Sequence, residues 1–246
     1  MKAIILAAGV SRRLYPVTYN TPKCLLELGG RAIIDYQLEA LRENGVTDIT
    51  IVTGYHREKL AAFLAANYSD LRFDYVINQH FFETNTSYSV YLCADVMKSS
   101  DTILMNADVL YPPEVLRRII ASAKPNVLAV EIVECDREEV KVIEGADRRI
   151  VAIGKELIPE NCLGEFIGVA KFSAAFNRKF AASLEKLIDA GGKADYFEAA
   201  IHPLLADNHV HYVDISDLPC IEIDFIEDYH RAKQLAQSNL FAPADN

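Results

Sequence analysis

The residues best suited to chemistry stand near the N-terminus, in the stretch LAAGVSRRLYPVTYNTPKCLL (residues 6–26). This stretch follows the apolar run KAIIL and combines small residues with Arg13 and Lys23. Small residues let the backbone approach a phosphate closely, and the two cations supply fixed positive charge. The stretch therefore predicts a loop that cradles a polyphosphate.

Two better-known phosphate loops do not fit this spacing. A Walker A loop requires G-x-x-x-x-G-K-[ST], but Leu14 stands five residues after Gly9. A dinucleotide fingerprint requires G-x-G-x-x-G, but the next glycine after Gly9 is Gly29. Taken alone, the loop could also be a simple glycine turn with solvated arginines.

The elements that must position this loop alternate along the first half of the chain. Apolar runs of strand length, such as DITIVTG and DTILMNAD, alternate with amphipathic stretches of helix length, such as IIDYQLEALREN and PPEVLRRIIASA. This alternation predicts an α/β fold with a largely parallel sheet. Ligands bind at the carboxyl ends of such strands, where the loop lies.

The pattern changes from about residue 126. NVLAVEIVE, EVKVIEG, RIVAIGK and EFIGVAKFS follow one another without helices between them, which predicts an antiparallel extension of the same sheet. Further helices are expected over YSVYLCADVM, AAFNRKFAASLEKLIDAGG, DYFEAAIHPLLADN and IEDYHRAKQLAQS. We therefore predict one Rossmann-like nucleotide-binding domain, residues 1–246, with a mixed and largely parallel sheet.

Composition excludes several functional classes. The net charge of -10 and the pI near 5.1 argue against a broad surface for nucleic acid or anionic membrane. No apolar run is long enough to cross a bilayer, so we expect a cytoplasmic protein. The five cysteines lack a C-x-x-C pair, which predicts reduced, mostly buried thiols and neither a disulfide framework nor a zinc site.

The N-terminal stretch resembles the signature L-A-A-G-x-G-x-R-L-x-P-x-T-x-x-x-P-K of the nucleotidyltransferases that activate sugar phosphates and phosphoalcohols. The matching positions are Gly9, Arg13, Leu14, Pro16, Thr18, Pro22 and Lys23. Ser11 departs from the pattern, because the family usually has a second glycine there. The resemblance extends through TILMNADVLY to CIEIDFIEDYHRA. TNTSYSVYL and IEID make the chain most similar to bacterial phosphocholine cytidylyltransferases and to enzymes that cytidylylate aminoethylphosphonate or phosphoglutamine.

This resemblance implies a Mg²⁺-dependent transfer of CMP from CTP to a small phosphorylated alcohol, amine or phosphonate, with release of pyrophosphate. Arg13 and Lys23 would neutralise charge on the triphosphate and the leaving pyrophosphate. Asp108 and Asp224 would be the metal ligands, since Mg²⁺ takes only one or two protein carboxylates. Each aspartate could instead cap the helix that follows it. Glu222 could reach the same side as Asp224, whereas Asp228 is expected within the last helix.

The nucleotide is expected to bind along the N-terminal loop and a second loop, TNTS. Asn85 could both donate to and accept from a pyrimidine edge, although TNTS could also be a helix N-cap. Thr53, Gly54 and Tyr55 are weaker candidates. The expected nucleotide and phosphate contacts are Leu6, Ala7, Ala8, Gly9, Ser11, Thr84, Asn85, Thr86 and, for the acceptor phosphate, Lys155.

An acceptor pocket is expected from the later strands. Its candidates mix acids with aromatics: Glu165, Phe166, Asp195, Tyr196 and Phe197. A quaternary ammonium is bound best by an aromatic cage in which Trp is the strongest partner, and the chain contains no Trp. The candidates therefore favour an acceptor with a primary amine or another hydrogen-bonding head.

Three other functions fit parts of the sequence. The chain could be a sugar-1-phosphate nucleotidyltransferase that uses UTP or dTTP. It could be a glycosyltransferase of similar fold, against which Arg13 and Lys23 argue. It could also be a catalytically silent nucleotide-binding regulatory protein, against which the presence of both carboxylates and both cations argues. A homo-oligomer is compatible with each of these functions.

Overall fold

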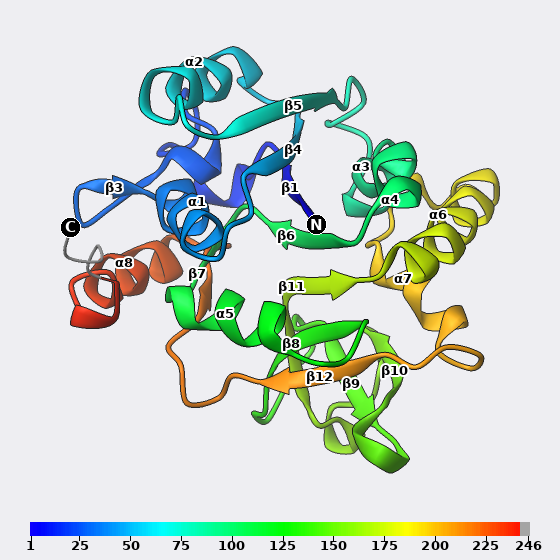
Figure 1. Ribbon diagram of the computed structural model, residues 1–246. Coiled ribbons are helices and arrows are strands. Elements are labelled where there is room, and N and C mark those ends of the chain that lie inside the picture. Colours follow the sequence, from blue (N-terminus) through cyan, green and yellow to red (C-terminus); the bar gives the residue numbers. More distant parts are fainter. Residues whose placement is uncertain (242–246) are drawn as a thin grey trace.

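The computed structural model describes residues 1–241, and its central feature is a mixed β-sheet (Figure 1). Residues 242–246 of the predicted domain lie outside the described residues. Within the described chain the sheet has nine strands: β1 (Lys2–Ala7), β4 (Asp48–Thr53), β5 (Arg72–Ile77), β6 (Thr102–Asn106), β8 (Val127–Glu131), β9 (Lys141–Glu144), β10 (Ile150–Gly154), β11 (Gly164–Phe172) and β12 (His211–Asp214).

The sheet has a parallel part and an antiparallel part, as the sequence predicts. Strands β6, β1, β4 and β5 are neighbours in that order and run parallel. Beyond β6 the sheet continues with β11, which is antiparallel to β6, β8 and β9. β10 pairs antiparallel with β9, and β12 returns parallel to β8. The mixed α/β fold is thereby confirmed.

Helices cover both faces of the sheet because successive residues of its buried strands point to opposite sides. On β1, Ala3 and Ile5 join one apolar core, whereas Ile4 and Leu6 join the other. The first core is covered by α1 (Ile33–Glu43), α2 (Arg57–Asn67) and α5 (Pro113–Ala121). The second is covered by α3 (Thr86–Tyr91), α4 (Ala94–Ser99), α6 (Ala174–Asp189) and α7 (Glu198–Ile201).

A third apolar cluster joins the two ends of the chain. Leu14 of the N-terminal loop packs in the same cluster as Ile223 and as Tyr229 of the last helix, α8 (Ile226–Leu235). Figure 1 shows α8 beside the short hairpin of β2 (Glu27–Leu28) and β3 (Arg31–Ala32). The cluster therefore places the segment around residue 224 against the N-terminal loop.

Three expectations from the sequence were wrong in detail. The helix expected over YSVYLCADVM is two helices, α3 and α4, separated at Leu92 and Cys93. The helix expected over DYFEAAIHPLLADN is α-helical only in α7 and then tightens to a 3₁₀ turn at His202–Leu204, because Pro203 cannot continue the α-helical hydrogen bonds. The cysteines are all free, but only Cys24 and Cys93 are fully buried.

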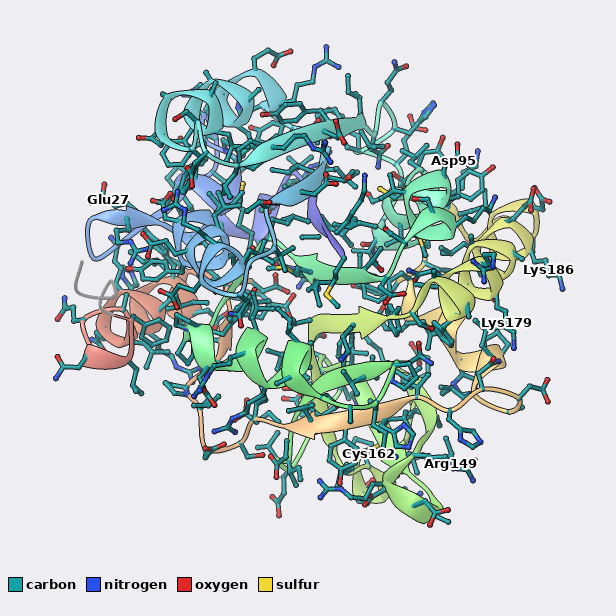
Figure 2. The ribbon with its side chains drawn as sticks, in the orientation of Figure 1. Glu27, Asp95, Arg149, Cys162, Lys179 and Lys186 are labelled. Carbon is teal, nitrogen blue, oxygen red and sulfur yellow. The ribbon has the colours of Figure 1, made fainter. Side chains whose placement is uncertain are left out.

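Charged side chains lie at the periphery of this arrangement. Figure 2 shows Lys179 and Lys186 on the outer side of α6, and Asp95 on the outer side of α4. Across the described residues, the helices are too short or too polar to cross a bilayer.

Candidate active site

The N-terminal loop leaves the carboxyl end of β1, the strand that lies between β6 and β4. Ser11, at the position where the signature has glycine, adopts a left-handed backbone with φ of 53°. Such a conformation suits glycine best, which explains the residue type in the signature. The hydroxyl of Thr18 donates to the Ser11 carbonyl at 2.9 Å and helps to hold this turn.

Lys23 is the buried cation of the site. Its side-chain Nζ donates to Asp108 Oδ2 at 2.8 Å and to Asp224 Oδ1 at 2.7 Å, and the residue is only 8% exposed. Burial alone would lower the pKa of Lys23, but the two carboxylates outweigh it and raise the pKa. Lys23 is therefore a fixed positive charge between two aspartates that are 116 residues apart in sequence (224 - 108).

A short ladder brings those two aspartates together. β7 (Val109–Leu110) follows Asp108 directly and pairs antiparallel with β13 (Ile221–Glu222), which precedes Asp224 by two residues. The backbone N–H of Ile223 donates to the Asp108 carbonyl at 3.1 Å. Asp108 lies two residues beyond β6, which ends at Asn106, so it is in the turn after the strand and does not end the strand as predicted.

Three carboxylates converge at this point. Asp108, Glu222 and Asp224 each place one oxygen within 4.8 Å of the others. Burial raises the pKa of Glu222, and repulsion from Asp108 and Asp224 adds to this shift. Burial would also raise the pKa of Asp224, but Lys23 and then Arg13 lower it. The oxygen donors and their spacing suit a hard divalent cation such as Mg²⁺.

Arg13 reaches the same group of carboxylates from the N-terminal loop. Its Nη1 lies 3.4 Å from Asp224 Oδ2, and its guanidinium lies 5.1 Å from the centre of the Phe225 ring. About half of the side chain is exposed, so this ion pair is weak and the guanidinium can turn toward a ligand. Arg13 therefore adds an adjustable positive charge beside the fixed charge of Lys23.

The second loop is organised by Asn78, which follows β5 and is 1% exposed. Its Nδ2 donates to Thr84 Oγ1 at 3.0 Å and to Ser89 Oγ at 3.2 Å, and its Oδ1 accepts from the His80 backbone at 2.9 Å. Asn85 caps α3, since its Oδ1 accepts from the Thr86 N–H at 2.8 Å. The loop is thus both the predicted helix cap and a wall of the cavity.

One cavity of about 380 Å³ joins these groups. Its charged lining is balanced, with four basic and four acidic residues: Arg12, Arg13, Lys23, Lys155, Asp108, Glu198, Glu222 and Asp224. At the end formed by the later strands, Lys155 Nζ lies 4.5 Å from the centre of the Tyr196 ring, and Phe166 is almost fully buried. Glu198 lines this same end and is 3% exposed.

Residues 3–213 of the chain match the family described as the MobA-like NTP transferase domain. This match covers more than half of the chain and includes the N-terminal loop, Asp108 and Lys155. The chain belongs to the MobA-like NTP transferase family. This family assignment makes the protein a nucleotidyltransferase, and it confirms the resemblance that the N-terminal signature indicates.

Individual relatives of this NTP transferase include cytidylyltransferases. The choline-phosphate cytidylyltransferase of Streptococcus pneumoniae is 28% identical over 240 residues, which are 97% of this chain and 99% of that protein. The CTP:phosphoglutamine cytidylyltransferase of Campylobacter jejuni is 30% identical over 205 residues, 76% of this chain and 79% of that protein. A structure of the Streptococcus pneumoniae CTP:phosphocholine cytidylyltransferase LicC has a TM-score of 0.79 and 25% identity, covering 96% of this chain and 99% of that one.

Most residues that the sequence singled out line the cavity of the transferase. Ala7 is the exception among the predicted nucleotide contacts, since it lines a separate cavity of about 50 Å³ that shares Gly9 and Lys23 with the main one. The residues brought together in the main cavity are Leu6, Ala8, Gly9, Ser11, Arg13, Lys23, Thr84, Asn85, Thr86, Asp108, Lys155, Phe166, Tyr196, Glu222 and Asp224.

The weaker candidates have other surroundings. Tyr55 donates from its hydroxyl to the Tyr19 carbonyl at 2.6 Å, and Gly54 packs closely against Ala8 and Phe81. Phe197 is wholly buried in the apolar core, and Asp195 accepts from the Ser87 N–H through its backbone carbonyl. Glu165 lines an adjoining acidic cavity of about 420 Å³.

Sequence reasoning missed several residues of the site. Asn78 and Asn106 both stand at carboxyl ends of parallel strands, where the rule on ligand sites could have found them. Arg12 lies beside the predicted Arg13, with its guanidinium 5.5 Å from the Phe82 ring centre. Glu198 gave no signal, because a single glutamate inside an expected amphipathic helix is usually solvated.

The buried Glu198 leads to a prediction about pH and stability. Burial raises its pKa to about 7, although its own backbone N–H and Lys155 act in the opposite direction. Between about pH 4.5 and 7 the folded state then holds more protons than the unfolded state, so Glu198 lowers stability as pH rises through this range. At pH 8 ionisation of the buried carboxyl costs about 3 kcal/mol of stability, so Glu198→Gln is expected to be more stable than the wild type by this amount minus the cost of the buried amide.

Urea unfolding at pH 5 and pH 8 measures this effect. We expect the advantage of Glu198→Gln at pH 8 to shrink or vanish at pH 5. Glu156→Gln is the matched control, because Glu156 is exposed and near in sequence, and it should give no such pH-dependent difference. A Glu198→Gln protein less stable than the wild type at both pH values would instead make the carboxylate a stabilising contact.

Proposed function

We propose that this NTP transferase is a Mg²⁺-dependent cytidylyltransferase that transfers CMP from CTP to a small phosphorylated alcohol, amine or phosphonate and releases pyrophosphate. The observation that carries the proposal is the convergence of Lys23, Asp108 and Asp224 at the end of the phosphate loop, with ion-pair distances of 2.8 and 2.7 Å. The names of the cytidylyltransferase relatives support CTP as the donor.

The N-terminal loop would bind the triphosphate. Gly9 lines the cavity, and a Cβ built on it would meet no atom within 4 Å, so the packing of the protein does not require glycine there. The open space suits close approach of a phosphate to the backbone. Arg13 and Lys23 would then stabilise the charge that develops on the α-phosphoryl group and on the departing pyrophosphate.

The acceptor's phosphate or phosphonate oxygen would attack the α-phosphorus, forming a new P–O bond while the bond to pyrophosphate breaks. This nucleophile is already an anion, so the reaction needs no general base. The difficulty is to bring two polyanions together, and the protein contributes by placing and neutralising them. Lys155, which lines the same cavity beside Tyr196, would hold the acceptor phosphate.

The donor set fits a divalent metal. Asp108 and Asp224 would hold it, and Asp108 Oδ1 is a buried oxygen without a hydrogen-bond partner among the described residues. When bound, the ion would supply positive charge to the phosphate oxygens. Glu222 lies close enough to be a third ligand, and burial, with added repulsion from Asp108 and Asp224, raises its pKa.

Asn85, held in place by the hydrogen bonds around Asn78, would recognise the nucleobase. An amide side chain offers both a donor and an acceptor, as a cytosine edge requires. Thr84 and Thr86 line the cavity on either side of Asn85. The loop is fixed by hydrogen bonds from Asn78 to Thr84 and Ser89, so its polar groups need little reorganisation when a base binds.

A screen of pyrophosphate release tests this proposal. The purified protein would be assayed with CTP, UTP, dTTP and ATP against phosphocholine, phosphoethanolamine, aminoethylphosphonate, phosphoserine, phosphoglutamine and several sugar 1-phosphates. We expect CTP to be preferred at least about tenfold in kcat/KM, and EDTA to stop turnover until Mg²⁺ is restored. Preference for UTP or dTTP with a sugar 1-phosphate would instead identify the protein as a sugar-1-phosphate nucleotidyltransferase. Nucleotide binding without turnover would indicate a silent regulator.

A further inference from the structure

Glu198 is a buried carboxyl group whose Oε2 has no hydrogen-bond partner among the described residues. Only 3% of the residue is exposed. No cation of the described chain lies within ion-pair distance of it. A carboxylate left unpaired in the interior is costly, and purely structural carboxylates are normally paired or hydrogen-bonded. The contacts of the described residues therefore do not explain why a carboxylate, and not an uncharged side chain, stands at this position.

The carboxylate faces a cavity that has the features of a site for a small zwitterion. Glu198 lines the main cavity together with Lys155, Tyr196 and Phe166. Tyr196 presents its ring face to the Lys155 ammonium at 4.5 Å, so this face already accommodates a cation. One end of the cavity thus offers a positive group, a negative group and two aromatic rings within one enclosure.

We propose that the acceptor's head group carries a primary ammonium and that Glu198 is the carboxylate that binds it. The inference rests on the proposed function and names the class of acceptor within it: a small molecule with a phosphate or phosphonate at one end and an –NH₃⁺ group at the other. Lys155 would take the anionic end, and Glu198 would take the cationic end.

Hydrogen bonding decides between a primary and a quaternary ammonium. A carboxylate oxygen binds N–H donors most strongly, and a quaternary ammonium has none. Quaternary groups are held instead by several aromatic faces. In this cavity Phe166 is only 2% exposed, and the face of Tyr196 is shared with Lys155. The unpaired Glu198 oxygen is therefore the feature that a primary ammonium satisfies and a quaternary one leaves unsatisfied.

The segment that carries Glu198 is held to the proposed base-reading loop. Backbone N–H groups of Asn85 and Ser87 donate to the carbonyls of Lys193 and Asp195, at 2.9 and 3.1 Å. The N–H of Phe197 donates to Thr86 Oγ1 at 3.1 Å. Glu198 is thus fixed relative to the nucleotide loop, which lets one short acceptor reach both its carboxylate and the reacting phosphate.

The first experiment varies only the methylation of the amine. With CTP and Mg²⁺ held constant, kcat/KM would be measured for phosphoethanolamine, its N-methyl and N,N-dimethyl derivatives, and phosphocholine. We expect a fall of at least about tenfold from the unmethylated to the trimethylated acceptor, because the donors to Glu198 are removed. Phosphocholine equal to or better than phosphoethanolamine would overturn the inference and leave the cytidylyltransferase proposal standing.

The second experiment removes the carboxylate. Glu198→Gln is expected to lower kcat/KM for phosphoethanolamine about 10- to 100-fold, the usual loss for a hydrogen bond to a charged group. The same variant should change kcat/KM less than about threefold for 2-hydroxyethyl phosphate, which lacks the amine. Glu156→Gln, with an exposed carboxylate close in sequence, should leave both values unchanged.

The remaining outcomes separate the two proposals. An equal loss for the amine and the hydroxyl acceptor in Glu198→Gln would assign a structural role to the residue and overturn the inference. Turnover with CTP only of phosphorylated acceptors that lack a primary ammonium would also overturn the inference alone. Turnover only with UTP or dTTP and a sugar 1-phosphate would overturn the proposed function, and the inference with it.

Discussion

Asp108→Asn is expected to abolish measurable pyrophosphate release while the protein stays folded. The substitution keeps the shape of the side chain but removes the negative charge on which binding of a divalent cation depends. A loss of more than about 100-fold in kcat corresponds to more than about 3 kcal/mol of transition-state stabilisation. Lys23 keeps its second partner, Asp224 at 2.7 Å, so the cation of the site is not left unpaired.

Steady-state rate over a Mg²⁺ titration and thermal unfolding should be measured on the same preparation. We expect the unfolding midpoint to move by only a few degrees, since one ion pair of Lys23 is lost and one remains. Asp95→Asn is the control, because Asp95 is an exposed carboxylate on α4 (Figure 2). A rate near that of the wild type at saturating Mg²⁺ would reject the role of Asp108 as a metal ligand.

The predictability of this site follows from where its residues stand. Arg13 and Lys23 stand in the loop after the first strand, and Asp108 comes directly after an apolar run, so the rule that ligands bind at the carboxyl ends of parallel strands applies to these three residues. The sequence therefore placed these three residues in one region, whereas Asp224 was paired with Asp108 only through the resemblance to the nucleotidyltransferases. It could not show the ladder between β7 and β13, because strands of two residues leave no periodic pattern.

Local periodicity also hides interruptions. Val90 and Met97 are both buried in the same core, so the apolar face runs on through the break between α3 and α4. The break lies at Cys93, whose backbone (φ -93°, ψ 11°) departs from helical geometry without glycine or proline to announce it. Pro203, in contrast, was a readable stop signal for the helix expected over residues 195–208.

Glu198 shows a different limit of sequence reasoning. Its significance is that its Oε2 has no hydrogen-bond partner within residues 1–241, and a missing contact is a property of the packed structure. Glu165 and Asp195, which stand beside aromatic residues in the sequence, were the better candidates by type and spacing. In the structure Glu165 lines the adjoining cavity, and Asp195 takes part through its backbone carbonyl. Only the fold shows which of the three acids faces the cavity beside Tyr196 and Lys155.

Lys23 is the cation of the cavity whose removal we expect to slow the reaction most. Four carboxylates and four basic groups line the cavity, and Lys23 is the buried member of the basic set. Arg13 is half exposed, so solvent screens it more than it screens Lys23. A positive charge in a water-poor site stabilises a developing negative charge far better than one in solvent.

Lys23→Ala is therefore expected to lower kcat by two or more orders of magnitude, about 3 kcal/mol or more of transition-state stabilisation. The variant also removes the ammonium that Asp108 and Asp224 share. Mg²⁺ then no longer competes with a neighbouring cation for these two carboxylates. We expect the Mg²⁺ concentration at half-maximal rate to stay equal or fall, even though the maximal rate drops. Lys98→Ala, at an exposed lysine on α4, is the control and should keep wild-type values.

The division of the effect between kcat and KM tells what Lys23 does. A loss in kcat with little change in KM for CTP means that Lys23 acts on charge formed in the transition state. A change confined to KM would assign it to ground-state binding of the triphosphate and contradict the catalytic role. Lys23→Arg tests the geometry separately: it keeps the charge, but a planar guanidinium cannot reproduce one Nζ shared between two carboxylates at 2.8 and 2.7 Å. We therefore expect this variant to recover only part of the lost rate, and full recovery would mean that charge alone, without the shared ammonium, is sufficient.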